Sequence, residues 1–226
     1  MLFDELTEVL DPEPHAAALN MAIDEVLLRT ARGPLLRVYR WARPAVSFGY
    51  FGRHAEVAAA WPDRELVRRW TGGGVVRHGA DVTYTLVVPR GCAFFNVRPA
   101  ESYRAIHEII AALLAEGGAP IALAPTTSTK VSDACLENAA RHDVIAGARK
   151  IAGAAQRRTR DGLLHQGSIQ DQPRDFAKRL ATALAQRVTQ RALSAGELDE
   201  AATLAAAKYA TPHWIQGILV SCPESS

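Results

Sequence analysis

The chain has 226 residues, of which 48% are hydrophobic and 22% are charged, so its composition is that of a globular protein with a sizeable core. Its net charge of +2 does not indicate a nucleic acid partner, and no apolar run approaches the ~18 residues of a membrane-spanning helix. Because the N-terminus also carries no signal-peptide pattern, we predict a cytoplasmic protein with no membrane partner.

Hydrophobic periodicity and turn residues predict the elements of the chain. In chain order we expect a helix over residues 15–30, strands over 35–41 and 45–48, a short helix over 54–61, strands over 65–69 and 82–88, a helix over 100–117, strands over 143–147, 150–156 and 163–169, and helices over 174–191 and 197–209. This order predicts a mixed α+β domain. We expect a single domain over residues 1–226, with a short helical C-terminal extension from about residue 172 and no full accessory domain.

The cysteines limit the chemistry of the chain. Cys92, Cys135 and Cys222 are few, odd in number and widely spaced, which argues against a disulfide framework and against a zinc site. No metal centre is therefore expected, and any cysteine function is that of a single thiol.

The stretch from Arg68 to His78 contains three consecutive glycines, Gly72, Gly73 and Gly74. Such a run suits a loop with positive φ, or one whose bare N–H groups lie against an anion, and the arginines at its start could clamp a phosphate or carboxylate. The alternative is a flexible surface turn with solvated arginines, which the glycines alone would favour. Because strands are expected on both sides, we predict a binding loop.

Several ordered motifs together resemble one known family. They are the stretch 68–78, Gly-Ala-Arg-Lys-Ile-Ala-Gly-Ala-Ala-Gln at 147–156, His-Gln-Gly-Ser-Ile at 165–169, Asn-Met-Ala-Ile-Asp-Glu at 20–25 and Val-Ser-Phe-Gly-Tyr-Phe at 46–51. This set resembles the lipoate–protein ligase A family and its octanoyltransferase relatives. The resemblance implies mixed β-sheets flanked by helices, in a biotin/lipoate ligase-like catalytic domain that attaches an eight-carbon acyl group to one lysine of a carrier domain.

The resemblance also implies site residues. Lys150 falls on the family's invariant lysine, and small residues suit a tunnel that an acyl chain threads. The expected substrate-binding residues are Arg69, Thr71, Gly72, Gly73, Gly74, His78, Gly153 and Ala154. Burying an octanoyl tail contributes ~0.8 kcal/mol per CH₂, or roughly 5 kcal/mol. Without the resemblance, Lys150 would be interpreted as a surface lysine on a hairpin and the small residues as close sheet packing.

Two branches of the family differ in how the acyl group is activated. In the transferases, the group passes from acyl carrier protein to a cysteine and then to the acceptor lysine, without a permanently bound cofactor. Cys135 precedes Lys150 by fifteen positions, a spacing that resembles this branch, so we expect Cys135 and Lys150 to be catalytic. The expected acceptors are apo lipoyl domains or the glycine-cleavage carrier protein.

The alternatives remain open at this point. An ATP-dependent lipoate–protein ligase would act through lipoyl-AMP and need ATP and Mg²⁺; Gly74 and the run 141–143 resemble that branch. Cys135 could also be an incidental buried residue. A non-catalytic acyl- or biotin-binding regulator is a further class. The neighbours His142 and Asp143 would point to opposite faces of a strand and so are not expected to form a relay with the cysteine.

Overall fold

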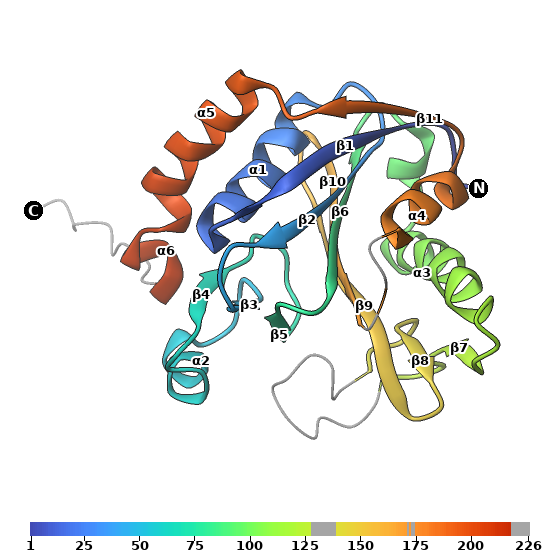
Figure 1. Cartoon of the computed structure of the whole chain (residues 1–226), viewed down its shortest axis with the longest axis horizontal. Helices are drawn as coiled ribbons and strands as arrows, with labels where there is room; N and C mark the ends of the chain where they lie inside the picture. Colours follow the sequence, from blue (N-terminus) through green and yellow to red (C-terminus); the bar gives the residue numbers. More distant parts are fainter. Residues whose placement is uncertain (128–138, 171, 173–174, 218–226) are drawn as a thin grey trace, which may run out of the picture.

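The computed structural model describes residues 1–127, 139–170, 172 and 175–217. It contains an eight-stranded sheet in the order β11-β1-β2-β6-β10-β9-β8-β7 and a three-stranded sheet in the order β4-β3-β5 (Figure 1). The strands are β1 (Phe3–His15), β2 (Leu35–Trp41), β3 (Ala45–Phe48), β4 (Glu65–Arg68), β5 (Val75–His78), β6 (Val82–Pro89), β7 (Ile121–Leu123), β8 (Val144–Ala146), β9 (Arg149–Arg158), β10 (Gly162–Ile169) and β11 (Ala185–Ala192). The fold is mixed α+β, as predicted.

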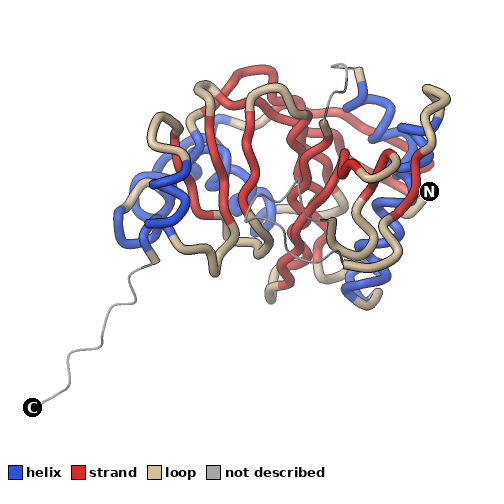
Figure 2. Tube along the Cα trace, turned by 90° about the horizontal axis from the view of Figure 1, so that it is seen from below, coloured by secondary structure: helices blue, strands red, loops and turns tan. Residues whose placement is uncertain are grey.

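Helices cover both faces of the large sheet (Figure 2). They are α1 (Ala17–Thr30), α2 (His54–Ala60), the 3-10 turn η1 (Ala93–Asn96), α3 (Pro99–Ala115), α4 (Phe176–Leu184), α5 (Ala195–Leu204), the π-helical turn η2 (Ala205–Tyr209) and α6 (Pro212–Gln216). Among the described residues, no helix combines the length and apolar character needed to cross a membrane.

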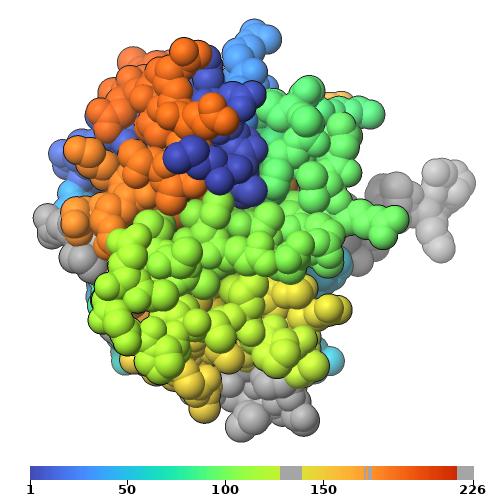
Figure 3. Space-filling view, turned by 90° about the vertical axis from the view of Figure 1, so that its right-hand side faces the viewer, coloured from blue at the N-terminus to red at the C-terminus, as the bar shows by residue number. Residues whose placement is uncertain are grey.

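The alternation of side chains along β6 explains why the protein has two main cores. Leu86 and Val88 pack into the core that α3 and α4 complete, whereas Val87 packs into the core that α1 and α5 complete. Successive residues of a strand point to opposite faces, so an almost continuous apolar run covers both sides of a central strand. Figure 3 shows the first of these layers from outside, with yellow-green α3 beside the blue N-terminal strand and the orange α4–β11 segment.

The C-terminal segment differs from the prediction. Residues 174–191 were expected to form one helix, but α4 ends at Leu184 and residues 185–192 form β11, which pairs in parallel with β1 over Phe3–Leu10. Neither β1 nor the short β5 was predicted. The ladder of β11 supplies backbone hydrogen bonds that outweigh the weak helical preference of this polar edge segment. The end of the chain therefore extends the main sheet.

Candidate active site

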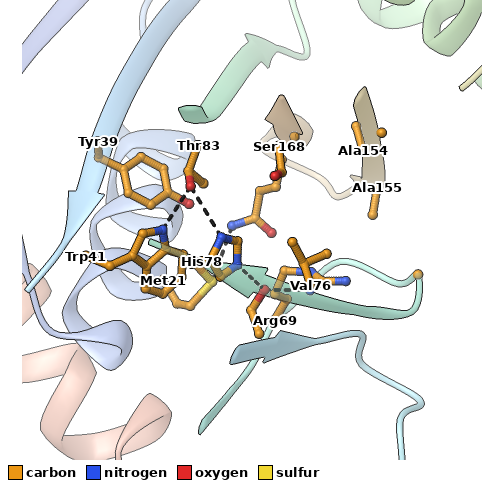
Figure 4. Close-up of a pocket in the computed structure, with 15 residues that line it drawn as sticks. Met21, Tyr39, Trp41, Arg69, Val76, His78, Thr83, Ala154, Ala155 and Ser168 are labelled. Atoms are coloured by element: carbon orange, nitrogen blue, oxygen red, sulfur yellow. Dashed lines mark hydrogen bonds between the residues drawn. The ribbon is translucent and has the colours of Figure 1, made fainter. Parts of the chain in front are cut away.

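A cavity with mainly apolar walls lies between the large sheet and the small sheet (Figure 4). Its walls come from β2, β3, β5, β6, β9, β10, α1 and the glycine loop. Of the sequence-predicted residues, the lining includes Arg69, Gly73, His78, Gly153 and Ala154. Thr71, Gly72, Gly74 and Lys150 do not line this volume, and Cys135 lies outside the described residues.

Lys150 is buried beside the cavity wall, not exposed on a hairpin. Its Nζ lies 2.8 Å from Asp143 Oδ2, and both side chains are almost fully enclosed. A Cβ on Gly153 would lie 2.3 Å from Lys150 Cε and 2.6 Å from Lys150 Nζ. Gly153 is therefore required because the lysine side chain lies directly across it.

A β-bulge explains this arrangement. Val144 pairs with Ala152, but the next residue of β8, Ile145, pairs with Lys150, so β9 holds one extra residue at this point. The extra residue shifts the alternation of side chains along β9 by one position, so Lys150 lies on the same face of the sheet as Gly153. In a regular strand these two residues would point to opposite faces.

Asp143 is itself fixed by a helix. Tyr103 on α3 donates a hydrogen bond from its hydroxyl to Asp143 Oδ1 at 2.5 Å and accepts one from the Ala154 N–H at 3.0 Å. The Ala140 N–H donates to the other carboxylate oxygen. The lysine, the carboxylate and the cavity wall are thus linked through one tyrosine, a role that the sequence did not indicate.

The glycine loop is braced from within. Arg69 was expected to clamp a substrate anion, but it is buried, and its Nη2 donates to the carbonyls of Gly72 and Gly74 at 3.0 and 2.9 Å. Its Nη1 donates to Ser47 Oγ at 2.7 Å. Gly73 has φ of +86°, which a residue with a side chain rarely adopts. The alternative of a surface turn with a solvated arginine is wrong for Arg69, because Ser47 and the loop carbonyls take these donors. Arg69 also lines the cavity, and its binding of a substrate anion stays a prediction.

Arg68 also serves the fold. It is buried, and its guanidinium donates to the carbonyls of Gly52, Trp214 and Ile215 at 2.8 to 2.9 Å. These bonds attach α6 to the start of the glycine loop. From the sequence, this arginine was predicted to help clamp an anion. Nothing in its neighbourhood in the sequence indicated that a residue 146 positions away accepts its hydrogen bond.

Thr71 connects the loop to the sheet and to α1. Its hydroxyl donates to Gln166 Oε1 at 2.8 Å, and Gln166 Nε2 donates to Asp24 Oδ2 at 2.7 Å. Asp24 also forms a fully buried ion pair with Arg37, at 2.7 Å. Each polar group here is satisfied by another, which is what burial of charge requires. The sequence motifs did not mark Gln166 or Arg37 as site residues, although both lie inside predicted strands.

His78 is the last residue of β5 in the small sheet. Its ring stacks on Trp41 with centroids 4.0 Å apart, Nε2 lies 2.7 Å from Ser47 Oγ, and Nδ1 lies 2.9 Å from Asp81 Oδ2. Burial lowers the pKa of His78, and the hydrogen bond to Asp81 offsets this only in part. Neither Ser47 nor Asp81 was singled out as a site residue from the sequence.

No metal centre was expected, and among the described residues no group of three His, Cys, Asp or Glu side chains is arranged to hold a metal ion.

Comparisons with known proteins show which family the chain is similar to. Residues 16–189 match the family model of the lipoyl protein ligase A/B catalytic domain. Octanoyltransferase LipM of Oceanobacillus iheyensis is 34% identical over 169 residues, which cover 71% of this chain and 62% of that protein. Octanoyltransferase LipM of Moorella thermoacetica is 34% identical over 179 residues, which cover 73% of this chain and 65% of that protein. The chain thus spans less than two thirds of the length of these relatives.

A solved structure shares the fold. A protein of T. acidophilum with bound lipoic acid has a TM-score of 0.72 and 22% identity, with 95% of this chain and 100% of that chain covered.

Proposed function

The chain belongs to the lipoyl protein ligase A/B catalytic domain family, and we propose that it transfers an octanoyl group to one lysine of a lipoyl carrier domain. The two relatives described above are named as octanoyltransferases. The observation that carries the proposal is the buried Lys150, whose ammonium lies against Gly153 in the wall of an apolar cavity. Such a cavity suits an acyl tail, and the lysine then lies near its reacting end.

In the proposed reaction, the donor is octanoyl-acyl carrier protein and the first acceptor is the Cys135 thiolate. Attack on the donor carbonyl forms a thioester at Cys135 and releases the carrier thiol. The acceptor lysine amine then attacks that thioester, forms the amide and releases the cysteine thiol. Lys150 contributes positive charge beside the developing oxyanion, and Asp143 fixes its position.

Mass spectrometry of the acceptor tests the proposal. An apo lipoyl domain, or the glycine-cleavage carrier protein, is incubated with the enzyme and octanoyl-acyl carrier protein, without ATP. We expect the acceptor to gain one octanoyl group. Without the acceptor, the enzyme and octanoyl-acyl carrier protein should form an octanoyl-enzyme adduct that hydroxylamine removes. Cys135→Ser should lose both. Transfer that requires octanoate, ATP and Mg²⁺ and survives in Cys135→Ser would instead identify an ATP-dependent ligase.

A further inference from the structure

One serine hydroxyl in the cavity wall, that of Ser47, is held by a histidine that an aspartate orients. The Asp81 carboxylate can only accept, so His78 Nδ1 carries the proton of the 2.9 Å bond between them. His78 Nε2 is then the acceptor, and the Ser47 hydroxyl donates to it across 2.7 Å. The serine thus donates to the histidine and the histidine donates to the aspartate, both at hydrogen-bond distance, as in the relay of a Ser-His-Asp catalytic triad. Because β3 and β5 are paired antiparallel, their backbone ladder fixes the serine against the histidine.

The charges around the relay suit proton removal from Ser47. Burial lowers the pKa of His78, so the ring is neutral near pH 7 and can take a proton. Burial alone would raise the pKa of Asp81, but hydrogen bonds from His78 and Ser168 outweigh that effect and lower it, which keeps the carboxylate ionised. Arg69 Nη1 donates to Ser47 Oγ at 2.7 Å, and this charge-assisted bond stabilises the oxygen as it loses its proton.

The relay also borders the cavity. Ser47, His78 and Arg69 all line the cavity, together with the small residues of β9 and β10 (Figure 4). A purely structural serine would not need a neutral histidine on one side and a guanidinium on the other in the wall of an apolar cavity. We infer that Ser47, His78 and Asp81 form a hydrolytic site for medium-chain acyl esters and thioesters.

The chemistry balances with water as the second substrate. Ser47 Oγ attacks the acyl carbonyl while its proton passes to His78 Nε2, and the bond to the leaving alcohol or thiol breaks as that group takes the proton. Water then attacks the acyl-serine ester and gives a proton to His78, which returns it to Ser47 Oγ as the free acid leaves. Ser47 and His78 are catalytic residues here, whereas Asp81 is a positioning residue.

The experiment uses the full-length Cys135→Ser variant, so that no adduct arises at that thiol. It is treated with an octyl fluorophosphonate and mapped by peptide mass spectrometry, and hydrolysis of 4-nitrophenyl octanoate is followed in parallel. We expect one phosphonyl adduct, on Ser47. Ser47→Ala should lose the adduct and at least ~10²-fold of the hydrolysis rate, the usual contribution of such a base and nucleophile. Asp81→Asn should lower the rate by stabilising the wrong tautomer of His78.

The matched control is Ser102→Ala, which removes another buried serine hydroxyl outside the cavity and should keep both the adduct and the rate. Failure of the fluorophosphonate to label Ser47 in the folded Cys135→Ser protein overturns the inference, even if Ser47→Ala does not fold. So does an unchanged hydrolysis rate in folded Ser47→Ala. Octanoyl transfer by the wild-type protein is measured separately. If Ser47 is labelled but the wild type transfers no octanoyl group, only the proposed transferase function is rejected. If the wild type transfers octanoyl but Ser47 is not labelled, only this inference is rejected.

Discussion

Replacement of Gly153 by alanine tests whether the position of Lys150 controls the proposed transfer. The added Cβ would lie 2.3 Å from Lys150 Cε and 3.1 Å from Asp143 Oδ1. Carbon atoms pack at about 3.5–4.0 Å, so the lysine side chain has to move by more than ~1 Å. The atoms that collide belong to the end of a flexible side chain, and the lysine yields before the backbone of β9 does.

The effect on rate should exceed the effect on stability. A misplacement of about 1 Å commonly lowers a rate by roughly 10²-fold, whereas overpacking of this kind destabilises a protein by about 1–3 kcal/mol. We expect Gly153→Ala to lie at the lower end of that range, because Lys150 can retain Asp143 as a partner in a distorted geometry.

The assay compares octanoyl transfer to a lipoyl domain with thermal denaturation of the same preparation. Gly33→Ala is the matched control, since its added methyl meets no atom within 4 Å, and both properties should stay at wild-type values. Wild-type transfer by a folded Gly153→Ala protein would refute the reasoning, because the displaced lysine would then have no part in the reaction.

Three further predictions concern buried charge. Arg69→Ala should destabilise the protein by about 1–3 kcal/mol, because loop carbonyls lose buried donors; an unchanged melting temperature contradicts this. Arg37→Ala should lower the free energy of unfolding, measured with urea, by about 3–5 kcal/mol, because it leaves the buried Asp24 carboxylate without this cation. The control Arg53→Ala breaks an exposed ion pair and should change that free energy by less than about 1 kcal/mol. Burial lowers the pKa of His107 to about 4, below its unfolded value of ~6.5, so the unfolded state takes up the proton first. Stability present above pH ~6.5 should therefore fall by about 3 kcal/mol as the pH drops to about 4, and His107→Gln should reduce that slope.

The sequence predicted the family and most of the secondary structure because those features have local signals. The helical spacing over residues 100–117 is bounded by its own stop signals, and the structure has α3 at Pro99–Ala115. The hairpins that carry Lys150 were likewise marked by turn residues, and the structure pairs β8 with β9 and β9 with β10. The family assignment is confirmed by the match over residues 16–189.

Interactions between distant segments were the part that the sequence did not predict. The strand β11 exists because β1 offers it an edge, about 180 residues away in the chain, and no local pattern records that pairing. The glycines after Arg69 suggested an anion-binding loop, but they gave no sign that Arg69 also donates to the loop's own carbonyls and to Ser47 on another strand. The bulge that brings Lys150 over Gly153 depends on the register with β8, which the sequence of β9 does not contain.

These contacts indicate different roles for the apolar wall of the cavity and for the polar groups beside it. In the proposed reaction, the apolar wall would bind the acyl tail without directional bonds, so tail length and burial would determine most of the binding energy. The groups that we propose to take part in the reactions are instead held by buried partners: Asp143 for Lys150, and Asp81 for His78. Inside such a site a polar group has few other partners, so its position is restricted to the geometry in which its bond is made. Substitutions in the wall should therefore change which acyl chain is accepted, whereas loss of either aspartate should slow reaction of every chain alike.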